Sequence, residues 1–153
     1  MMKDVVISMH SVHNCGTEDQ DELEFSTDGY FFRDGDTYCF SYMETEVTGL
    51  DGTRTSVFVR PDEVVVDRDG TITGRMIFRE KEKSSFLYET PYGTATLGIS
   101  TRRIYRDFNE SGGEMELDYV LDMEHTVVSK NKFHIKIEEQ RGMDGYGKSD
   151  TAG

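Results

Sequence analysis

The chain has 153 residues and carries 30 acidic against 17 basic side chains, which gives it a formal net charge of −13. This acidity argues against a nucleic-acid partner, whose phosphates need Lys and Arg, and against binding to an anionic membrane surface. A chain of this length buries about 70% of its extended surface, so one domain can fold without disulfides or metals.

Turn signals divide the first half of the chain into segments. The pairs Asp34-Gly35, Asp51-Gly52 and Asp69-Gly70 readily adopt the positive φ angles of tight hairpin turns. Apolar and polar residues alternate on both sides of these pairs, as they do in strands with one buried face. Gly29 interrupts the second segment, and a glycine inside a strand often marks a bulge or a barrel corner. The predicted strands of this half are residues 3–12, 23–34, 37–46, 53–60, 63–67 and 71–80.

The second half continues the pattern. Two short strands, 86–90 and 94–101, flank a predicted turn at Pro91-Tyr92-Gly93, and residues 104–110 are expected to be irregular or to hold a short helical turn. The Gly112-Gly113 turn signal precedes residues 114–127, the longest regular alternation in the chain, which predicts a strand through His125. Phe133, Ile135 and Ile137 repeat the alternation in a last strand.

These segments predict an all-β chain folded as a single antiparallel meander. An open sheet of about ten strands would expose two edges and curl strongly, whereas closure removes the edges. We therefore expect a β-barrel of about eight to ten strands, wide enough to hold side chains or one small ligand, with a β-sandwich as the alternative. Residues 1–140 are expected to form the barrel, and the Gly-rich residues 141–153 a flexible tail.

Several segments, in this order along the chain, resemble the YwiB-like family of small uncharacterised bacterial proteins. They are Lys3-Asp4-Val5-Val6-Ile7-Ser8, residues 46–52, Glu89-Thr90-Pro91-Tyr92-Gly93-Thr94, Leu97-Gly98-Ile99-Ser100-Thr101, Gly113-Glu114-Met115-Glu116-Leu117-Asp118-Tyr119 and Ser129-Lys130-Asn131-Lys132-Phe133. The resemblance covers residues 3 to about 139 and implies a calycin-like barrel, similar in shape to lipocalins. It implies no activity and transfers no catalytic residue. The Gly-x-Trp signature of lipocalins is missing because the chain has no Trp.

Polar residues at inward positions of the predicted barrel are the first candidates for a site. Tyr38, Tyr42 and Glu44 share one register of their strand, as do Tyr119 and His125 of theirs. Inside the barrel, the Glu44 carboxylate would need a partner such as Arg75, Arg102 or Arg103; at the mouth it would be solvated. His125 is either a polar group in a cavity or a hydrogen-bonded histidine of the core or rim.

Other candidates belong to the rim of the predicted barrel. Arg102 and Arg103 end a strand, where they hold an anionic ligand or balance nearby carboxylates. Tyr92 and Thr101 lie near the turn at Pro91, and Tyr92 is expected to cap one end of the barrel.

Three classes of function fit this architecture. The first is binding of a small hydrophobic or amphipathic molecule, with candidate contacts at Tyr38, Tyr42, Glu44, Tyr92, Thr101, Arg103, Tyr119 and His125. A lumen packed with side chains, with no cavity larger than a few waters, would exclude it. The alternative is a non-catalytic interaction or structural module that acts through its acidic exterior or through a homodimer interface. An enzyme is the weakest reading, because no motif assigns a catalytic residue, a metal site or a cofactor.

The expected compartment follows from three observations. No apolar stretch approaches the roughly 20 residues that span a bilayer, and residues 1–4 lead directly into a predicted strand without a signal-peptide core. Cys15 lies in a polar loop and Cys39 in an aromatic strand, so the two do not suggest a disulfide framework. We therefore expect a reducing, cytoplasmic environment.

Overall fold

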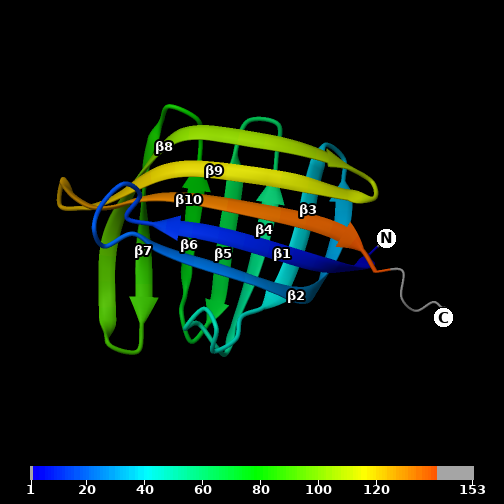
Figure 1. Ribbon diagram of the computed structural model, residues 1–153, viewed down its shortest axis with the longest axis horizontal. Coiled ribbons are helices and arrows are strands. Elements are labelled where there is room, and N and C mark those ends of the chain that lie inside the picture. Colours follow the sequence, from blue (N-terminus) through cyan, green and yellow to red (C-terminus); the bar gives the residue numbers. More distant parts are fainter. Residues whose placement is uncertain (1, 141–153) are drawn as a thin grey trace.

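A computed structural model describes residues 2–140 as ten antiparallel strands (Figure 1). The strands are β1 (Lys3–His13), β2 (Asp21–Asp34), β3 (Thr37–Met43), β4 (Thr53–Val59), β5 (Val64–Gly70), β6 (Gly74–Phe78), β7 (Lys83–Thr90), β8 (Gly93–Asn109), β9 (Gly112–Met123) and β10 (Thr126–Glu139). The prediction of a flexible tail at 141–153 falls outside the described residues. No helix in the described part of the chain is long and apolar enough to cross a membrane.

Each strand pairs with the next along the chain except at β6 and β7, and the first strand pairs with the last. The open seam between β6 and β7 is bridged at one end, where the backbone amides of Thr73 and Glu89 donate to each other's carbonyls at 3.0 and 2.8 Å. At its other end, the turn that joins β6 to β7 is bonded to β8, because Lys81 N donates to Thr101 O and Thr101 N donates to Glu82 O. The result is a nearly closed barrel, which confirms the predicted all-β antiparallel architecture.

The barrel is flattened into two layers whose strands cross at a steep angle. In Figure 1, β1, β2, β9, β10 and the second part of β8 cross over β3–β7. Gly29 marks the corner where β2 leaves β1 for β3, and a Cβ there would clash with Ile7 Cδ1 and lie 2.5 Å from Ser41 O. Gly98 marks the corresponding corner of β8, where a Cβ would meet the Asp122 carboxylate at 2.7 Å.

Alternate residues of each strand fill the lumen with apolar side chains. The largest fully buried ones are Phe31, Phe40, Phe78, Ile7, Ile99, Met115, Leu117 and Ile135. Since each buried aliphatic or aromatic side chain contributes about 1.5–3 kcal/mol, this lining is the main source of stability.

Two predictions about the second half of the chain are wrong. Residues 104–110 are not irregular, because β8 runs unbroken as a strand of 17 residues to Asn109. Its register shifts between Thr101 and Arg103, and this bulge breaks the alternation that reveals a strand in sequence. The strand predicted over 114–127 ends at Met123, and Glu124 and His125 form a turn with φ angles of 51° and 67°.

Candidate functional site

The two ends of the lumen have different linings. Tyr38 stacks on Phe31 and Phe108 with ring centroids 6.1 and 5.7 Å apart, and Phe40 stacks on Phe108. These four side chains form the aromatic end of the lumen. The opposite half contains the polar end, formed by Tyr42, Glu44, Thr55, Arg68, Thr101 and Tyr119.

Glu44 follows the last residue of β3 and turns its carboxylate into the barrel. Its amide donates to Thr53 O at 2.8 Å, which extends the ladder between β3 and β4 by one residue. The Thr55 hydroxyl donates to Glu44 Oε2 at 2.5 Å and the Thr48 hydroxyl to Oε1 at 2.8 Å. Because Glu44 is only 6% exposed, a solvated position at the mouth is excluded.

The arginines predicted to pair with Glu44 do not do so. Arg75, Arg102 and Arg103 are all exposed, and Arg103 lies opposite Asp118 in the register of β8 and β9. Two hydroxyl donors balance the carboxylate instead. Short hydroxyl-to-carboxylate hydrogen bonds are charge-assisted and keep a buried anion satisfied without an ion pair.

Tyr42 is buried beside Glu44 and remains a neutral hydroxyl. Burial raises the pKa of Tyr42 well above its ordinary value, and the Glu44 charge and a hydrogen bond to Glu44 raise it further. The positive charge of Arg68 acts in the opposite direction and lowers the Tyr42 pKa. The Tyr42 hydroxyl is therefore a hydrogen-bond donor near the buried carboxylate.

A cavity of about 40 Å³ lies within the polar end. Its polar lining is Tyr42, Thr55, Arg68 and Tyr119, and its apolar lining is Val57, Val66, Met76, Phe78, Leu117 and Phe133. This volume accepts a few waters or one small polar group, whereas pockets for whole ligands measure about 300–1,000 Å³. A whole small molecule therefore does not fit inside the lumen, and at most the head group of a larger molecule enters the cavity.

Arg68 and Thr101 each carry a polar atom without a partner. Among the described residues, Arg68 Nε and Thr101 Oγ1 are the buried side-chain N and O atoms that make no hydrogen bond. Arg68 Nη1 lies 3.4 Å from Met76 Sδ, so the other edge of the guanidinium is left for another acceptor. Thr101 pairs in register with Tyr119, which borders the cavity. Unsatisfied donors of this kind cost stability and indicate a missing partner.

The structure brings together half of the residues predicted from sequence. Tyr42, Glu44, Thr101 and Tyr119 belong to the polar end, and Tyr38 lies inside the lumen at the aromatic end. Tyr92 is 99% exposed on the turn between β7 and β8, so it does not cap the barrel. Arg103 is exposed, and His125 lies on an exposed turn, not on the inward face of a strand.

Arg68 and Thr55 were missed in the sequence. Arg68 follows Val64 and Val66 on the inward face of β5, but the predicted strand 63–67 stops one residue before Arg68 and three before the end of β5 at Gly70. The run Val64-Val65-Val66 hides the alternation that would have assigned Arg68 to the lumen. Thr55 alternates with Val57 and Val59, and that pattern alone could have identified it.

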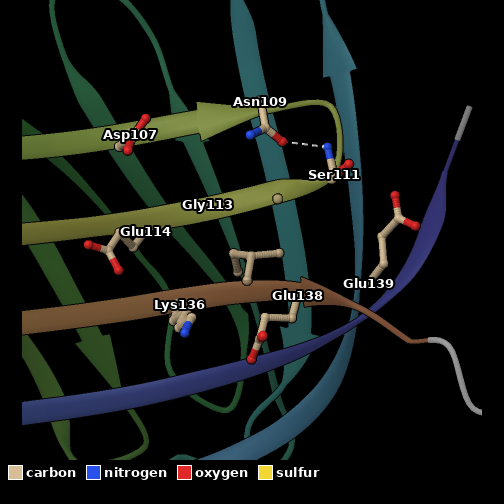
Figure 2. Close-up of a pocket in the computed structure, with 10 residues that line it drawn as sticks. Asp107, Asn109, Ser111, Gly113, Glu114, Lys136, Glu138 and Glu139 are labelled. Atoms are coloured by element: carbon tan, nitrogen blue, oxygen red, sulfur yellow. Dashed lines mark hydrogen bonds between the residues drawn. The ribbon is translucent and has the colours of Figure 1, made fainter.

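A second hollow lies on the outer surface near the turn between β8 and β9. It measures about 700 Å³, and Figure 2 shows Asp107, Glu114 and Glu138 around it with Lys136 among them. These carboxylates project from three strands, and in the described residues no group of three or more His, Cys, Asp or Glu side chains is arranged to hold a metal ion. The hollow is a broad acidic surface without a built binding site.

Comparison with known proteins supports the architecture. The family described as "Domain of unknown function (DUF1934)" matches residues 7–135. The chain belongs to this family. A relative named "Uncharacterized beta-barrel protein YwiB" from Bacillus subtilis (strain 168) is 28% identical over 100 residues, which are 65% of this chain and 69% of the relative. The predicted membership of the YwiB-like family is thereby confirmed.

A solved structure shows the same fold. The crystal structure of the ywiB protein from Bacillus subtilis matches with a TM-score of 0.81 and 23% identity over 91% of this chain and 93% of that one. At this identity the likeness shows the fold alone, and the name of the relative adds no activity. A function has to be argued from the polar end itself.

Proposed function

We propose that this barrel binds a small amphipathic molecule whose polar end enters the cavity at the polar end of the lumen. One observation supports the proposal: in a largely apolar lumen, the side chains of Tyr42, Arg68 and Tyr119 converge on a cavity. A few convergent polar groups in an apolar cavity are the usual form of a ligand site.

The polar end is a poor arrangement for stability. Burying a charged group costs free energy unless hydrogen bonds compensate. Well-packed apolar side chains in the same place often give equal or greater stability. Glu44 is compensated by two hydroxyls, but Arg68 Nε is not compensated by any described residue. A binding role explains why a guanidinium occupies the lumen.

The size of the cavity limits what enters it. About 40 Å³ accommodates a head group, so the rest of the ligand lies outward from it. Tyr119 and Phe133 line the cavity and are only partly buried, so an apolar tail that extends out of the cavity can contact both rings. The proposed ligand is therefore amphipathic, with its polar end innermost.

A second candidate function is a module that binds another protein or a second copy of this chain. The observation in its favour is the exposed apolar group at the hairpin of β9 and β10, where Met123, Val127 and Val128 are 42%, 58% and 55% exposed. Light scattering of wild type and Val127→Ser tests it: a dimer that the substitution dissociates supports it, and a monomer that retains a small molecule contradicts it.

Both cysteines are free thiols, with Cys39 buried and Cys15 partly buried. Free thiols persist in reducing compartments, which supports the proposal that the protein acts in the cytoplasm.

Native mass spectrometry of the freshly purified full chain tests the ligand proposal. We expect the folded protein to carry an additional small mass that is released on denaturation. Val66→Met lengthens a side chain that lines the cavity, and it should abolish the additional mass. Leu87→Met is the matched control, because Leu87 is 55% exposed on β7. Thermal denaturation establishes that both variants are folded.

Two results would contradict the ligand proposal. One is wild-type protein without any retained small molecule that also shows no binding to a panel of amphipathic compounds. The other is a retained molecule that Val66→Met and Leu87→Met hold equally well, since that molecule would lie elsewhere.

A further inference from the structure

The free edge of Arg68 determines which chemistry the cavity can recognise. Arg68 Nη1 faces Met76 Sδ, while Nε–H is buried and has no partner among the described residues. In a guanidinium, Nε–H and one N–H of Nη2 point the same way and form a fork. That fork matches the two oxygens of a planar anion.

Tyr119 and Thr101 are further donors on the same side of the lumen. Tyr119 borders the cavity beside Arg68, and burial raises the pKa of Tyr119, so its hydroxyl stays protonated. Thr101, opposite Tyr119 in the register, has a buried hydroxyl without a partner. Donors are thus in excess on this side of the lumen, and the missing group is an acceptor.

The nearby acid limits the charge of that acceptor. Glu44 and Arg68 both lie close enough to Tyr42 to shift its pKa, in opposite directions. Both carboxylate oxygens of Glu44 already accept hydrogen bonds. Since two hydroxyls already compensate Glu44, the single positive charge of Arg68 is left to balance one negative charge of a ligand. A dianion such as a phosphate would meet repulsion from Glu44 that no second cation offsets.

We propose that the ligand's polar end is a carboxylate, bound by the Nε–Nη2 edge of Arg68 with the Tyr119 hydroxyl as a second donor. This assignment rests on the proposed function and names the ligand class: a small monocarboxylic acid with an apolar tail. A carboxylate is planar, carries one charge and fits a space of a few waters.

Hexanoate is the probe, with hexanamide and hexyl phosphate as comparators of the same tail. The full-length protein is titrated with each compound while the ¹⁵N–¹H signal of Arg68 Nε is followed by NMR; the loss of this signal in Arg68→Met assigns it. We expect hexanoate to shift the signal and to bind about tenfold or more tightly than hexanamide or hexyl phosphate.

Variants locate the binding within the barrel. Arg68→Met should weaken hexanoate binding about tenfold or more, whereas Arg103→Met is the matched control at an exposed arginine and should leave it unchanged. Glu44→Gln removes the neighbouring negative charge and should bind hexanoate several-fold more tightly. The wild-type comparison of the three probes does not depend on the folding of any variant.

Equal affinity for hexanoate and hexanamide, tighter binding of hexyl phosphate, or equal hexanoate binding by wild type and Arg68→Met would overturn the assignment. Failure of this assignment can be separated from failure of the proposed function. If the wild type ignores hexanoate but retains a neutral or cationic molecule that Val66→Met loses, the carboxylate is wrong and the binding role stands. If no compound is retained or bound, both are wrong.

Discussion

The aromatic and polar ends of the lumen are built on neighbouring segments of the same strands, yet they contribute differently to the molecule. At the aromatic end, Phe31 and Phe40 are each 1% exposed and stack with their neighbours, so every buried surface adds to stability. At the polar end, a carboxylate and a guanidinium occupy positions that apolar side chains could fill. The contrast shows that one half of this lumen is built for stability and the other is not, which is the basis of the proposal that the polar end binds a ligand.

The largest effect is expected from truncation at the aromatic end. Phe40→Ala removes a fully buried ring and should lower the free energy of unfolding by about 3–5 kcal/mol, measured by urea denaturation. Tyr30→Ala is the control, since Tyr30 is 47% exposed on β2 and should cost about 0.5 kcal/mol or less. Similar losses for the two variants would mean that the aromatic cluster is not the stabilising half.

A smaller effect is expected from one hydroxyl at the polar end. Thr55→Val leaves the size of the side chain nearly unchanged but removes the donor to Glu44 Oε2, so it should lower the free energy of unfolding by about 1–3 kcal/mol. Thr96→Val, at an exposed position of β8, should change it by about 0.5 kcal/mol or less. An unchanged free energy of unfolding in Thr55→Val would show that the buried Glu44 carboxylate does not depend on this hydrogen bond.

The hydroxyl groups of Tyr42 and Tyr119 make the stability depend on pH in the alkaline range. The folded-state pKa values of Tyr42 and Tyr119 are raised above the ordinary value of 10.0, whereas in the unfolded chain both tyrosines ionise near that value. Above pH 10 the unfolded state therefore binds fewer protons than the folded state, and stability falls as the pH rises. Each tyrosine contributes a slope of about 1.4 kcal/mol per pH unit at most, and none below pH 9.

Urea unfolding at a series of pH values, with tyrosinate absorbance as a second probe, measures this slope. In Tyr42→Phe the slope should decrease, because one of the two buried hydroxyls no longer titrates. The same alkaline slope in wild type and Tyr42→Phe would argue that Tyr42 is not held in the neutral form by its surroundings.

The smallest effect is expected at a turn that sequence assigned to the lumen. His125 has a φ of 67°, which glycine adopts without steric cost, so His125→Gly should raise the free energy of unfolding by about 0.5 kcal/mol. Retention of the small molecule should be unchanged. If His125→Gly lowered the stability or lost the bound small molecule, His125 would again be a candidate site residue.

The barrel could be predicted from the sequence because the patterns that indicate strands and corners are local. Alternating residues such as Met115 and Leu117 report which face of a strand is buried, and Gly29 was predicted as a bulge or corner. The structure places the change of partner of β2 beside that glycine. Period-two patterns and glycines depend on the backbone nearby, which is why they can be read without a structure.

The site was only half predictable because it depends on contacts between distant strands. Glu44 and Tyr42 share a strand and were assigned together, but Arg68 joins them only through the pairing of β4 with β5. The bulge after Thr101 turned Arg103 outward, and the turn at His125 ended a pattern that appeared to continue. A shift of register by one residue exchanges the two faces of a strand, and no local pattern reports it.

The most direct test of the division between the two ends is urea unfolding of the double variant Arg68→Met/Glu44→Gln. Removing the buried carboxylate and the half-buried guanidinium together avoids leaving either one uncompensated. If the polar end is kept for binding, the double variant should be as stable as wild type or more stable by about 1–4 kcal/mol. A double variant less stable than wild type by about 2 kcal/mol or more would contradict this, since the polar end would then hold the barrel together as well.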